Sequence, residues 1–283
     1  MMRLSPDEVV AMAIKRIIEP EQLGSLREQG QLLLAQVTSP AVYAQGHIEG
    51  AVLVPPQALI SGRPPALGKL PDLDQLEKLF GAIGYSPEHL VVAYDDEGGG
   101  WAGRLIWTLE VIGHERWCYL NGGLQAWAHA GLPLTQTAPE IRATHPALQI
   151  DPTPLAEADD VLQAIDDEDT LIWDVRSADE YAGRRVAAAR GGHIPGAVHL
   201  DWLDLMDPAR QLRLRDDMAQ LLESHGITPK KRIITHCQTH HRSGLSYMAA
   251  RILGYPNVKA YHGSWSEWGN DPELPVVTGD EPQ

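Results

Sequence analysis

Short apolar runs alternate with amphipathic stretches along both halves of the chain. In the second half, the runs at residues 171–175, 232–236 and 258–261 indicate buried strands. Apolar positions recur at helical spacing over residues 212–224 and 243–253, which predicts two helices. Strands that alternate with helices favour a parallel sheet covered on both faces. In such sheets, functional sites lie beyond the carboxyl ends of the strands.

The pattern occurs twice. Residues 37–51 read VTSPAVYAQGHIEGA, and the second half contains the similar segments VRSADEY at 175–181 and GHIPGA at 192–197. The second copy holds eight additional residues before its Gly-His-Ile, and this insert carries Arg184, Arg185 and Arg190. Glycines and tryptophans further on keep one spacing in both halves, at Gly103, Gly113 and Trp127 and at Gly244, Gly254 and Trp268. A repeat this long indicates a duplicated domain rather than a solenoid.

The duplication sets the expected domain limits. We expect a first domain over residues 1–138, a linker over 139–154 and a second domain over 155–283. The linker segment is rich in proline and lacks periodicity. A linker this short leaves the two domains packed against each other. The paired halves also favour a monomer, because the duplication supplies the interface that a homodimer would otherwise form.

Composition narrows the class of protein. The 283 residues are 43% hydrophobic and 22% charged, with a formal net charge of -15. Such a charge argues against nonspecific binding to nucleic acid or to an anionic membrane. The apolar stretch at residues 9–14 is too short for a secretory signal, and no apolar run is long enough to span a membrane, so we expect a cytoplasmic protein. Two cysteines so far apart do not suggest a disulfide framework.

Candidate chemistry gathers where a predicted strand meets a predicted helix. The β-branched run at residues 233–235 ends at His236 and Cys237, and Ser243 is expected to be the N-cap of the next helix. Cys237 would then lie at a helix N-terminus, where unpaired N–H groups and the helix dipole favour a thiolate. The turn between them supplies one permanent cation and partial ones from imidazoles, in the order Gln238, Thr239, His240, His241 and Arg242. We infer a local cationic pocket on an acidic protein.

These residues carry a resemblance to a known family. The segment HCQTHHRSG, the duplicated GHI-x-GA motifs and the closing GS-x-x-x-W of Gly263, Ser264 and Trp268 resemble the tandem-domain rhodaneses over nearly the whole chain. The loop is most similar to bacterial thiosulfate:cyanide sulfurtransferases that carry Cys-Gln-Thr-His-His-Arg. The resemblance implies an α/β fold with two rhodanese-like domains, each a mainly parallel sheet covered by helices on both faces. It also implies a six-residue loop, from Cys237 to Arg242, that cradles the cysteine sulfur.

The resemblance further implies a two-step displacement. The Cys237 thiolate would attack the outer sulfur of thiosulfate, sulfite would leave, and cyanide or another thiophile would take the sulfur from the resulting persulfide. The expected partners are this small anionic donor and a thiophilic acceptor, either a small molecule or a sulfur-accepting protein. No cofactor is expected. In the first half, Asp95 stands at the position of Cys237. A carboxylate cannot hold a persulfide, so the first domain is expected to be catalytically silent.

Binding of the donor is less clearly specified. The histidines and arginine of the loop suit a doubly anionic donor better than the uncharged loop of the mercaptopyruvate sulfurtransferases does. Mammalian rhodaneses, however, place basic residues just after the cysteine and just before the equivalent of Tyr181. Here Gln238, Thr239 and Glu180 occupy those places. The candidates that remain are Arg242, the histidines and the arginines of the insert.

Two other functions share part of this pattern. Cysteine phosphatases, including a rhodanese-fold group, use His-Cys-x5-Arg, whereas four residues separate Cys237 from Arg242 here. One residue fewer makes a tighter loop, suited to a single sulfur atom. A persulfide carrier that serves a biosynthetic partner would need the same cysteine. A metal site is disfavoured, because adjacent histidines point in different directions and no second cluster has ligand spacing.

The remaining candidates have mainly structural interpretations. Cys118 lies in an apolar stretch and is expected to be buried. His47 and His193 recur in both halves, which favours a structural role at a turn. Asp174 follows a predicted strand and Trp202 follows the second GHI-x-GA motif. We retain both as candidates that support the site.

Overall fold

The computed structural model describes residues 15–28 and 31–281, and within them each half of the chain builds its own five-stranded sheet. The apolar stretch at 9–14 lies outside the described residues. The first sheet has the order β1-β5-β4-β2-β3, with β1 (Ile17–Ile18), β2 (Leu32–Val37), β3 (Val52–Val54), β4 (Leu90–Tyr94) and β5 (Trp117–Leu120). The second repeats it as β6-β12-β11-β7-β8, with β6 (Leu155–Ala156), β7 (Thr170–Asp174), β8 (Val198–His199), β11 (Arg232–His236) and β12 (Val258–Tyr261).

Every neighbouring pair in both sheets is parallel, which confirms the predicted fold class. The helices of the first half are η1 (Pro20–Gln22), α2 (Leu23–Arg27), α3 (Pro40–Gln45), η2 (Pro56–Leu59), α4 (Leu73–Ala82), α5 (Gly100–Val111) and α6 (Gly123–His129). Those of the second half are α7 (Ala158–Ala164), α8 (Ala178–Tyr181), η3 (Trp202–Leu205), η4 (Pro208–Arg210), α9 (Met218–Ser224), α10 (Arg242–Ile252) and α11 (Ser264–Trp268). The short strands β9 (Met206–Asp207) and β10 (Arg213–Leu214) form an antiparallel pair between η3 and α9.

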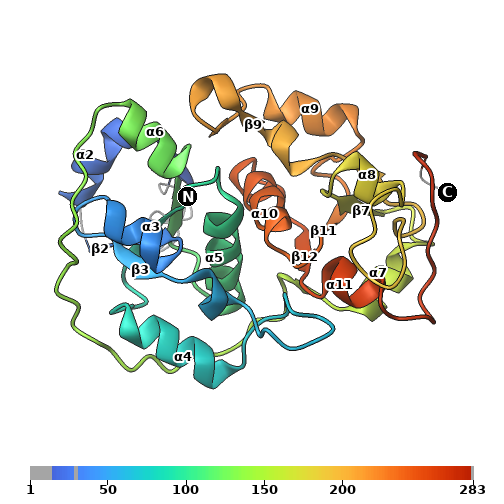
Figure 1. Cartoon of the computed structure of the whole chain (residues 1–283), viewed down its shortest axis with the longest axis horizontal. Coiled ribbons are helices and arrows are strands. Elements are labelled where there is room, and N and C mark those ends of the chain that lie inside the picture. Colours follow the sequence, from blue (N-terminus) through green and yellow to red (C-terminus); the bar gives the residue numbers. More distant parts are fainter. Residues whose placement is uncertain (1–14, 29–30, 282–283) are drawn as a thin grey trace, which may run out of the picture.

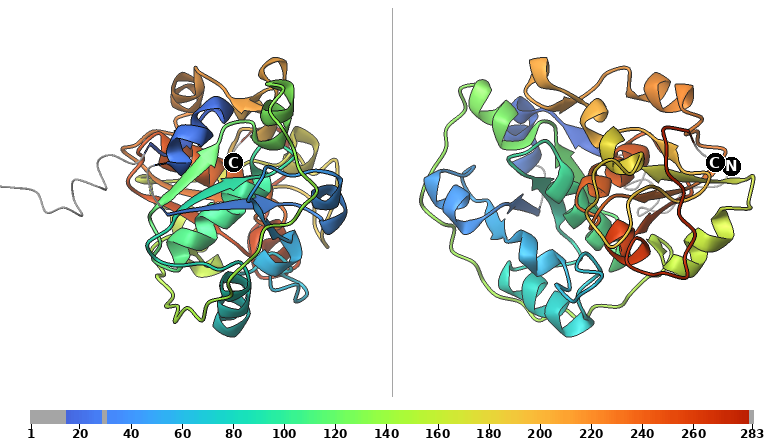
Figure 2. Two further views of the ribbon diagram at one scale, coloured as in Figure 1. Left: turned by 90° about the vertical axis from the view of Figure 1, so that its left-hand side faces the viewer. Right: turned by 45° about the vertical axis from the view of Figure 1, so that its right-hand side comes forward.

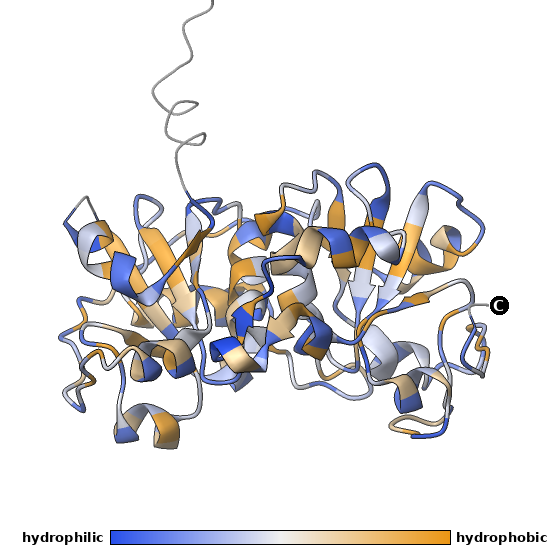
Figure 3. Cartoon of the chain, turned by 90° about the horizontal axis from the view of Figure 1, so that it is seen from above, coloured by the Kyte–Doolittle hydropathy of each residue, from blue (hydrophilic) through white to orange (hydrophobic). Residues whose placement is uncertain are grey.

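The apolar side chains divide into three clusters that follow the layers. The largest joins the inner faces of both sheets to α4, α5, α9 and α10, so one core runs through both halves. The outer faces have separate clusters, which contain Trp127 in the first half and Trp265 and Trp268 in the second. These three tryptophans pack helices against the sheets. Figure 3 shows the apolar strands of the two sheets on either side of the central helices.

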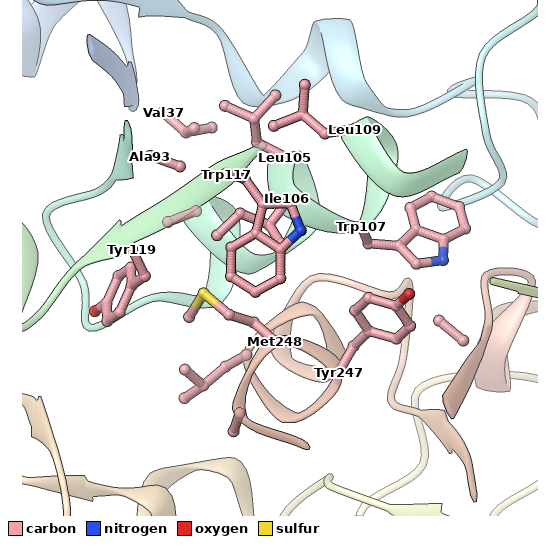
Figure 4. Packing of buried hydrophobic residues seen from close by; sticks show 14 of the residues in the cluster. Val37, Ala93, Leu105, Ile106, Trp107, Leu109, Trp117, Tyr119, Tyr247 and Met248 are labelled. Carbon is pink, nitrogen blue, oxygen red and sulfur yellow. The ribbon is translucent and has the colours of Figure 1, made fainter. Parts of the chain in front are cut away.

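Helices α5 and α10 form the central contact between the halves and lie side by side in the middle of the molecule (Figure 1). They approach closely because each presents a glycine: a Cβ on Gly103 would lie 2.2 Å from the backbone oxygen of Gly244. Larger side chains fill the space around this crossing, and Figure 4 shows Trp107, Trp117, Tyr247 and Met248 among them. Glu110 of α5 accepts hydrogen bonds from Tyr247 and Arg251 of α10. The two domains are therefore joined by both apolar packing and buried polar contacts.

The segment between α6 and β6 runs along the outside of the first domain (Figure 2). It is held there by hydrogen bonds to the α4 region, including Thr144 N–H to Gly81 O at 3.0 Å and Leu148 N–H to Glu77 Oε1 at 3.1 Å. Within residues 15–28 and 31–281, every helix is too short or too polar to span a lipid bilayer. The exact domain limits drawn from the sequence stay a prediction.

Most elements predicted in the second half are confirmed, and two details are wrong. Strands β11 and β12 occupy the predicted residues, and β7 begins one residue earlier. The helix predicted from residue 212 begins at Met218, because Leu212 has a left-handed φ of 61° and the following residues pair as β10. Ser243 is not the N-cap of α10: the helix begins at Arg242 with His241 at the N-cap position. The Ser243 side chain has different partners, described below.

Candidate functional site

Cys237 follows β11 directly, at the carboxyl edge of the second sheet. The last residue of β11, His236, pairs with Asp174 at the end of β7, and α10 begins five residues after the cysteine. The Cys237 side chain is completely buried. The loop from Cys237 to Arg242 therefore encloses its own sulfur between a strand end and a helix N-terminus, as the pattern predicted.

Hydrogen-bond donors converge on this sulfur. The Ser243 hydroxyl donates to Cys237 Sγ at 3.5 Å, and the backbone N–H groups of Thr239 and Ser243 also point at it. Burial raises the pKa of the Cys237 thiol, but the Arg242 charge and these donors outweigh burial and lower the pKa below its ordinary value. The site thus favours an anion on this sulfur.

The N-terminal turn of α11 holds the loop from behind. The Cys237 N–H donates to Ser264 Oγ at 3.3 Å, and the Trp265 N–H donates to Cys237 O at 2.9 Å. The Ser266 N–H donates to Gln238 O at 2.9 Å. The residues of the closing GS-x-x-x-W pattern therefore support the loop, a role that the motif alone did not indicate.

His240 shapes the loop but adds no charge. Its φ of 55° is left-handed, a conformation that costs a residue other than glycine about 1–2 kcal/mol. The side chain is buried, and its Nδ1 lies 2.7 Å from Ser243 Oγ. Burial lowers the pKa of His240 well below its ordinary value and lowers that of His236 to about 4. Both imidazoles are neutral near pH 7, so the partial charges expected from them are absent.

Arg242 is neutralised by a carboxylate. Its guanidinium donates to both oxygens of Glu180, at 2.7 and 2.9 Å, and both side chains are largely buried. Burial raises the pKa of Glu180, but the Arg242 contact outweighs it and lowers the pKa to about 2. At this position, the cationic pocket inferred from the sequence therefore holds an arginine whose charge is balanced by a carboxylate.

Two arginines of the insert hold it against the surrounding chain rather than facing the loop. Arg184 pairs with Asp179 and Asp280 at 2.8 Å each, and Arg190 donates to backbone carbonyls of the C-terminal segment, including Leu274 O at 2.8 Å. The exposed Arg185 side chain makes no ion pair with any described residue. The insert reaches the loop through Gln238, whose side-chain amide donates to Ala187 O at 3.0 Å.

The two supporting candidates lie on either side of the loop. Asp174 is fully buried and binds Arg176, with oxygens 2.6–3.0 Å from the guanidinium nitrogens, and lies 3.6 Å from His236 Nε2. The Trp202 ring is half-buried, 5.7 Å from the His241 ring. Both lie next to the loop, and their roles stay predictions.

The residues expected to be structural occupy buried positions. Cys118 is completely buried on β5, and burial raises the pKa of its thiol to about 12. His47 stacks on Tyr43 with ring centroids 3.8 Å apart, and His193 stacks on Tyr181 at 3.7 Å. Each histidine also binds the backbone oxygen of its tyrosine through Nδ1. The two halves thus use one arrangement to hold the same turn.

Asp95 occupies in the first domain the place that Cys237 occupies in the second. It follows β4, and Oδ1 accepts hydrogen bonds from the N–H groups of Glu97, Gly98 and Gly99 at 2.8–3.2 Å. Oδ2 accepts one from Ala102 N–H at 3.0 Å. The loop N–H groups of the first domain therefore surround a carboxylate that belongs to the loop itself.

Comparison with known proteins decides the family. The model of the rhodanese-like domain matches the chain twice, at residues 19–130 and 157–271. The chain belongs to the rhodanese family. The thiosulfate sulfurtransferase of Azotobacter vinelandii is 53% identical to this rhodanese over 260 residues, which cover 92% of the chain and 96% of the relative. The thiosulfate sulfurtransferase of Pseudomonas aeruginosa is 50% identical over the same shares.

More distant relatives of this rhodanese carry other names. The sulfur carrier protein TtuD of Thermus thermophilus is 33% identical over 254 residues, which cover 85% of the chain and 88% of the relative. Among solved structures, the anaerobic ergothioneine biosynthesis enzyme of Chlorobium limicola superposes with a TM-score of 0.83 at 24% identity, over 94% of this chain and 70% of that one. At that identity the likeness shows the shared fold alone.

Sequence reasoning did not identify the residues through which the first domain covers the loop of this rhodanese. A Cβ on Gly68 would lie 2.1 Å from Thr239 O, so the 60–70 segment crosses over and lies directly on the loop. Trp101 stacks on His241 with centroids 4.4 Å apart, and Glu97 contacts the same imidazole. These contacts connect positions more than a hundred residues apart, so no local pattern could have indicated them.

Proposed function

We propose that the chain transfers sulfane sulfur from thiosulfate to cyanide or another thiophile, with Cys237 as the carrier. The observation that carries the proposal is a fully buried cysteine sulfur facing a serine hydroxyl and two backbone N–H groups. Relatives 50–53% identical over 92% of the chain are named thiosulfate sulfurtransferases. The loop residues that would surround the transferred atom are Gln238, Thr239, His240, His241, Arg242 and Ser243.

The proposed cycle has two displacements. The Cys237 thiolate attacks the outer sulfur of thiosulfate, the sulfur–sulfur bond of the donor breaks, and sulfite leaves with the bonding electron pair. The persulfide anion that remains accepts hydrogen bonds from the donors already directed at Sγ. Cyanide then attacks the outer sulfur, thiocyanate leaves, and the thiolate is restored. Charge balances in both steps, and no oxidant or cofactor is required.

The size of the loop favours sulfur over phosphate. Four residues separate Cys237 from Arg242, one fewer than in the cysteine phosphatases. In addition, both terminal nitrogens of Arg242 donate hydrogen bonds to Glu180. A phosphate ester would need that guanidinium fork to bind its own oxygens. We therefore propose sulfur transfer at this site and keep phosphatase activity as an outcome to be tested.

A protein acceptor is the second candidate. The name of the Thermus thermophilus relative, sulfur carrier protein, favours it, and a carrier would use the same persulfide. Small-molecule turnover separates the two functions, since an enzyme completes many cycles with cyanide whereas a dedicated carrier releases sulfur efficiently only to its protein partner. We also propose that the chain is a monomer, because one apolar core already joins its two halves. We further propose that it acts in the cytoplasm.

Intact-protein mass spectrometry tests the proposed function. Incubation with thiosulfate should add one sulfur atom, peptide mapping should place it on Cys237, and cyanide should remove it as thiocyanate. Cys237→Ser should abolish uptake, while Cys118→Ser is the matched control and should retain it. Equal loss in both variants, or no uptake by the wild type, would refute the assignment. Hydrolysis of a phosphate ester by the same preparation would indicate the phosphatase instead.

A further inference from the structure

The charges that face Cys237 are almost all compensated. Arg242 is paired with Glu180, Arg176 is paired with Asp174, and the imidazoles of His236 and His240 are neutral near pH 7. His241 contacts the carboxylate of Glu97. Among these groups, Arg242 is the charge that lowers the pKa of Cys237 most, and it is shared with Glu180. A buried charge is costly unless it is paired, so an anion on the completely buried sulfur has only a shared counter-ion among them.

Arg104 of α5 is a buried cation that has no carboxylate partner among the described residues. Its side chain is completely buried, and its hydrogen bonds go to backbone oxygens: Nε and Nη2 donate to Leu59 O at 3.1 and 2.6 Å, and Nη2 donates to Lys69 O at 3.4 Å. No carboxylate of the described residues pairs with it, and its buried Nη1 has no partner among them. Burial lowers the pKa of Arg104 to about 9, a change that negative charge at Cys237 opposes. The guanidinium is therefore still charged at neutral pH.

The helix crossing brings Arg104 to the loop of the other domain. A Cβ on Gly244 would lie 2.5 Å from the Arg104 backbone nitrogen, and Gly244 is the residue after Ser243. The Arg104 guanidinium carbon lies 4.5 Å from the centre of the Trp107 ring, and the His240 ring lies 4.5 Å from the same ring. Arg104 therefore lies next to Gly244, which follows Ser243, and next to Trp107, which packs on His240. Ser243 and His240 in turn contact each other beside the Cys237 sulfur.

We propose that Arg104, supplied by the first domain, is a second electrostatic counter-ion, beside Arg242, of the Cys237 thiolate and of the persulfide that follows. Arg104 acts as a positioning residue, through its charge rather than by contact with the sulfur. This inference rests on the proposed function of Cys237 and deepens it. The domain that carries Asp95 in place of the loop cysteine would then contribute to the chemistry the one buried cation near the loop that no described carboxylate neutralises.

The test is a titration of the Cys237 thiolate by its ultraviolet absorbance, which needs no access to the buried sulfur. Each spectrum is corrected with the same protein carrying Cys237→Ser, so that tyrosines and Cys118 cancel. Arg104→Gln removes the charge but retains a donor for Leu59 O. A unit charge within about 10 Å, at an effective dielectric constant of about 20, changes a pKa by about one unit. We expect the midpoint in Arg104→Gln to rise by about that amount, with roughly tenfold less thiolate well below both midpoints.

Two further variants separate charge from structure. Arg104→Lys retains the charge and should keep the midpoint near that of the wild type. Arg251→Met removes another arginine from the same interface, but one that Glu110 neutralises, and should leave the midpoint unchanged. If Arg104→Gln does not fold, Arg104→Met replaces it, because its unbranched chain can occupy the same space on Trp107.

A folded neutral variant whose midpoint equals that of the wild type would overturn the inference. So would an equal rise in Arg104→Lys and Arg104→Gln, because the effect would then follow packing rather than charge. Uptake of sulfur from thiosulfate by the wild type is measured separately. Failure of uptake refutes the proposed function, whereas an unchanged midpoint in a protein that does take up sulfur refutes the role of Arg104 alone.

Discussion

Replacement of Asp174 by asparagine should destabilise the second domain strongly. Asp174 and Arg176 are 0% and 1% exposed, and their oxygens and nitrogens lie 2.6–3.0 Å apart. Removing one partner of such a pair leaves the other charge buried, at a cost of about 3–5 kcal/mol. Asparagine can still accept one of the hydrogen bonds, so we expect a loss near the lower limit, about 3 kcal/mol. That is a large share of the roughly 5–15 kcal/mol that stabilises a typical protein.

Urea denaturation at neutral pH measures this loss. With a denaturant dependence of about 3 kcal/mol per molar urea, the unfolding midpoint of the second domain should fall by about 1 M. Asp179→Asn is the control, because it breaks the exposed pair with Arg184 and should hardly move the midpoint. If Asp174→Asn and Asp179→Asn have the same midpoint, the reasoning about burial is wrong.

The difference in unfolding free energy between the wild type and Asp174→Asn should also depend on pH, and in one direction only. Burial alone would raise the pKa of Asp174, but Arg176 outweighs burial and holds the pKa well below its ordinary value. A depressed folded pKa adds stability that is fully present above the unfolded pKa of about 3.9 and disappears as the pH falls through the folded value. The gap between wild type and Asp174→Asn should therefore be constant above about pH 5 and narrow below pH 4. A gap that widens in acid would contradict this.

Three other substitutions test the loop and the interface. Ser243→Ala removes a donor worth about 1 kcal/mol to the thiolate, so the pKa of Cys237 should rise by about 0.7 units in an absorbance titration; an unchanged pKa would show that the 3.5 Å contact contributes nothing. Glu180→Gln removes the carboxylate beside Arg242, so steady-state kinetics should show a several-fold lower KM for thiosulfate, and a higher KM would mean that the pair serves to hold the loop. Gly103→Ala places a Cβ 2.2 Å from a backbone oxygen of α10, so thermal unfolding should show a loss of about 1–3 kcal/mol, and wild-type stability would refute the tight helix crossing.

The sequence predicted the elements whose pattern is local. Strands β11 and β12 were placed at the correct residues because short apolar runs between polar turns fit a buried parallel strand. The start of α9 was misplaced because the amphipathic spacing from Leu212 continues through a β-ladder, and a left-handed φ at Leu212 is invisible in a hydropathy pattern. Ser243 fits an N-cap by type, but its hydroxyl lies beside the sulfur.

For the site, the sequence indicated the loop but not its electrostatics. A strand, a cysteine and a helix start are consecutive in the chain, so their meeting point could be predicted. Whether Arg242 is a free cation depends on Glu180, which lies 62 residues earlier and reaches it through tertiary packing. The approach of Arg104 depends on how two glycines let α5 and α10 cross. Burial, which makes His236 and His240 neutral, is likewise a property of the packed structure.

Asp95 shows how the loop of the first domain keeps its shape without a cysteine at this position. Its carboxylate accepts hydrogen bonds from three N–H groups of the loop and one of α5, which would otherwise be available to an anion from solution. Burial, followed by the charge of Glu97, raises the pKa of Asp95 to about 6, so this carboxyl group gains a proton in mildly acidic solution. The Asp95 carboxylate thus fills the place in the first domain that an anion on Cys237 takes in the second, and α5, which begins directly after this loop, packs against α10 of the other domain.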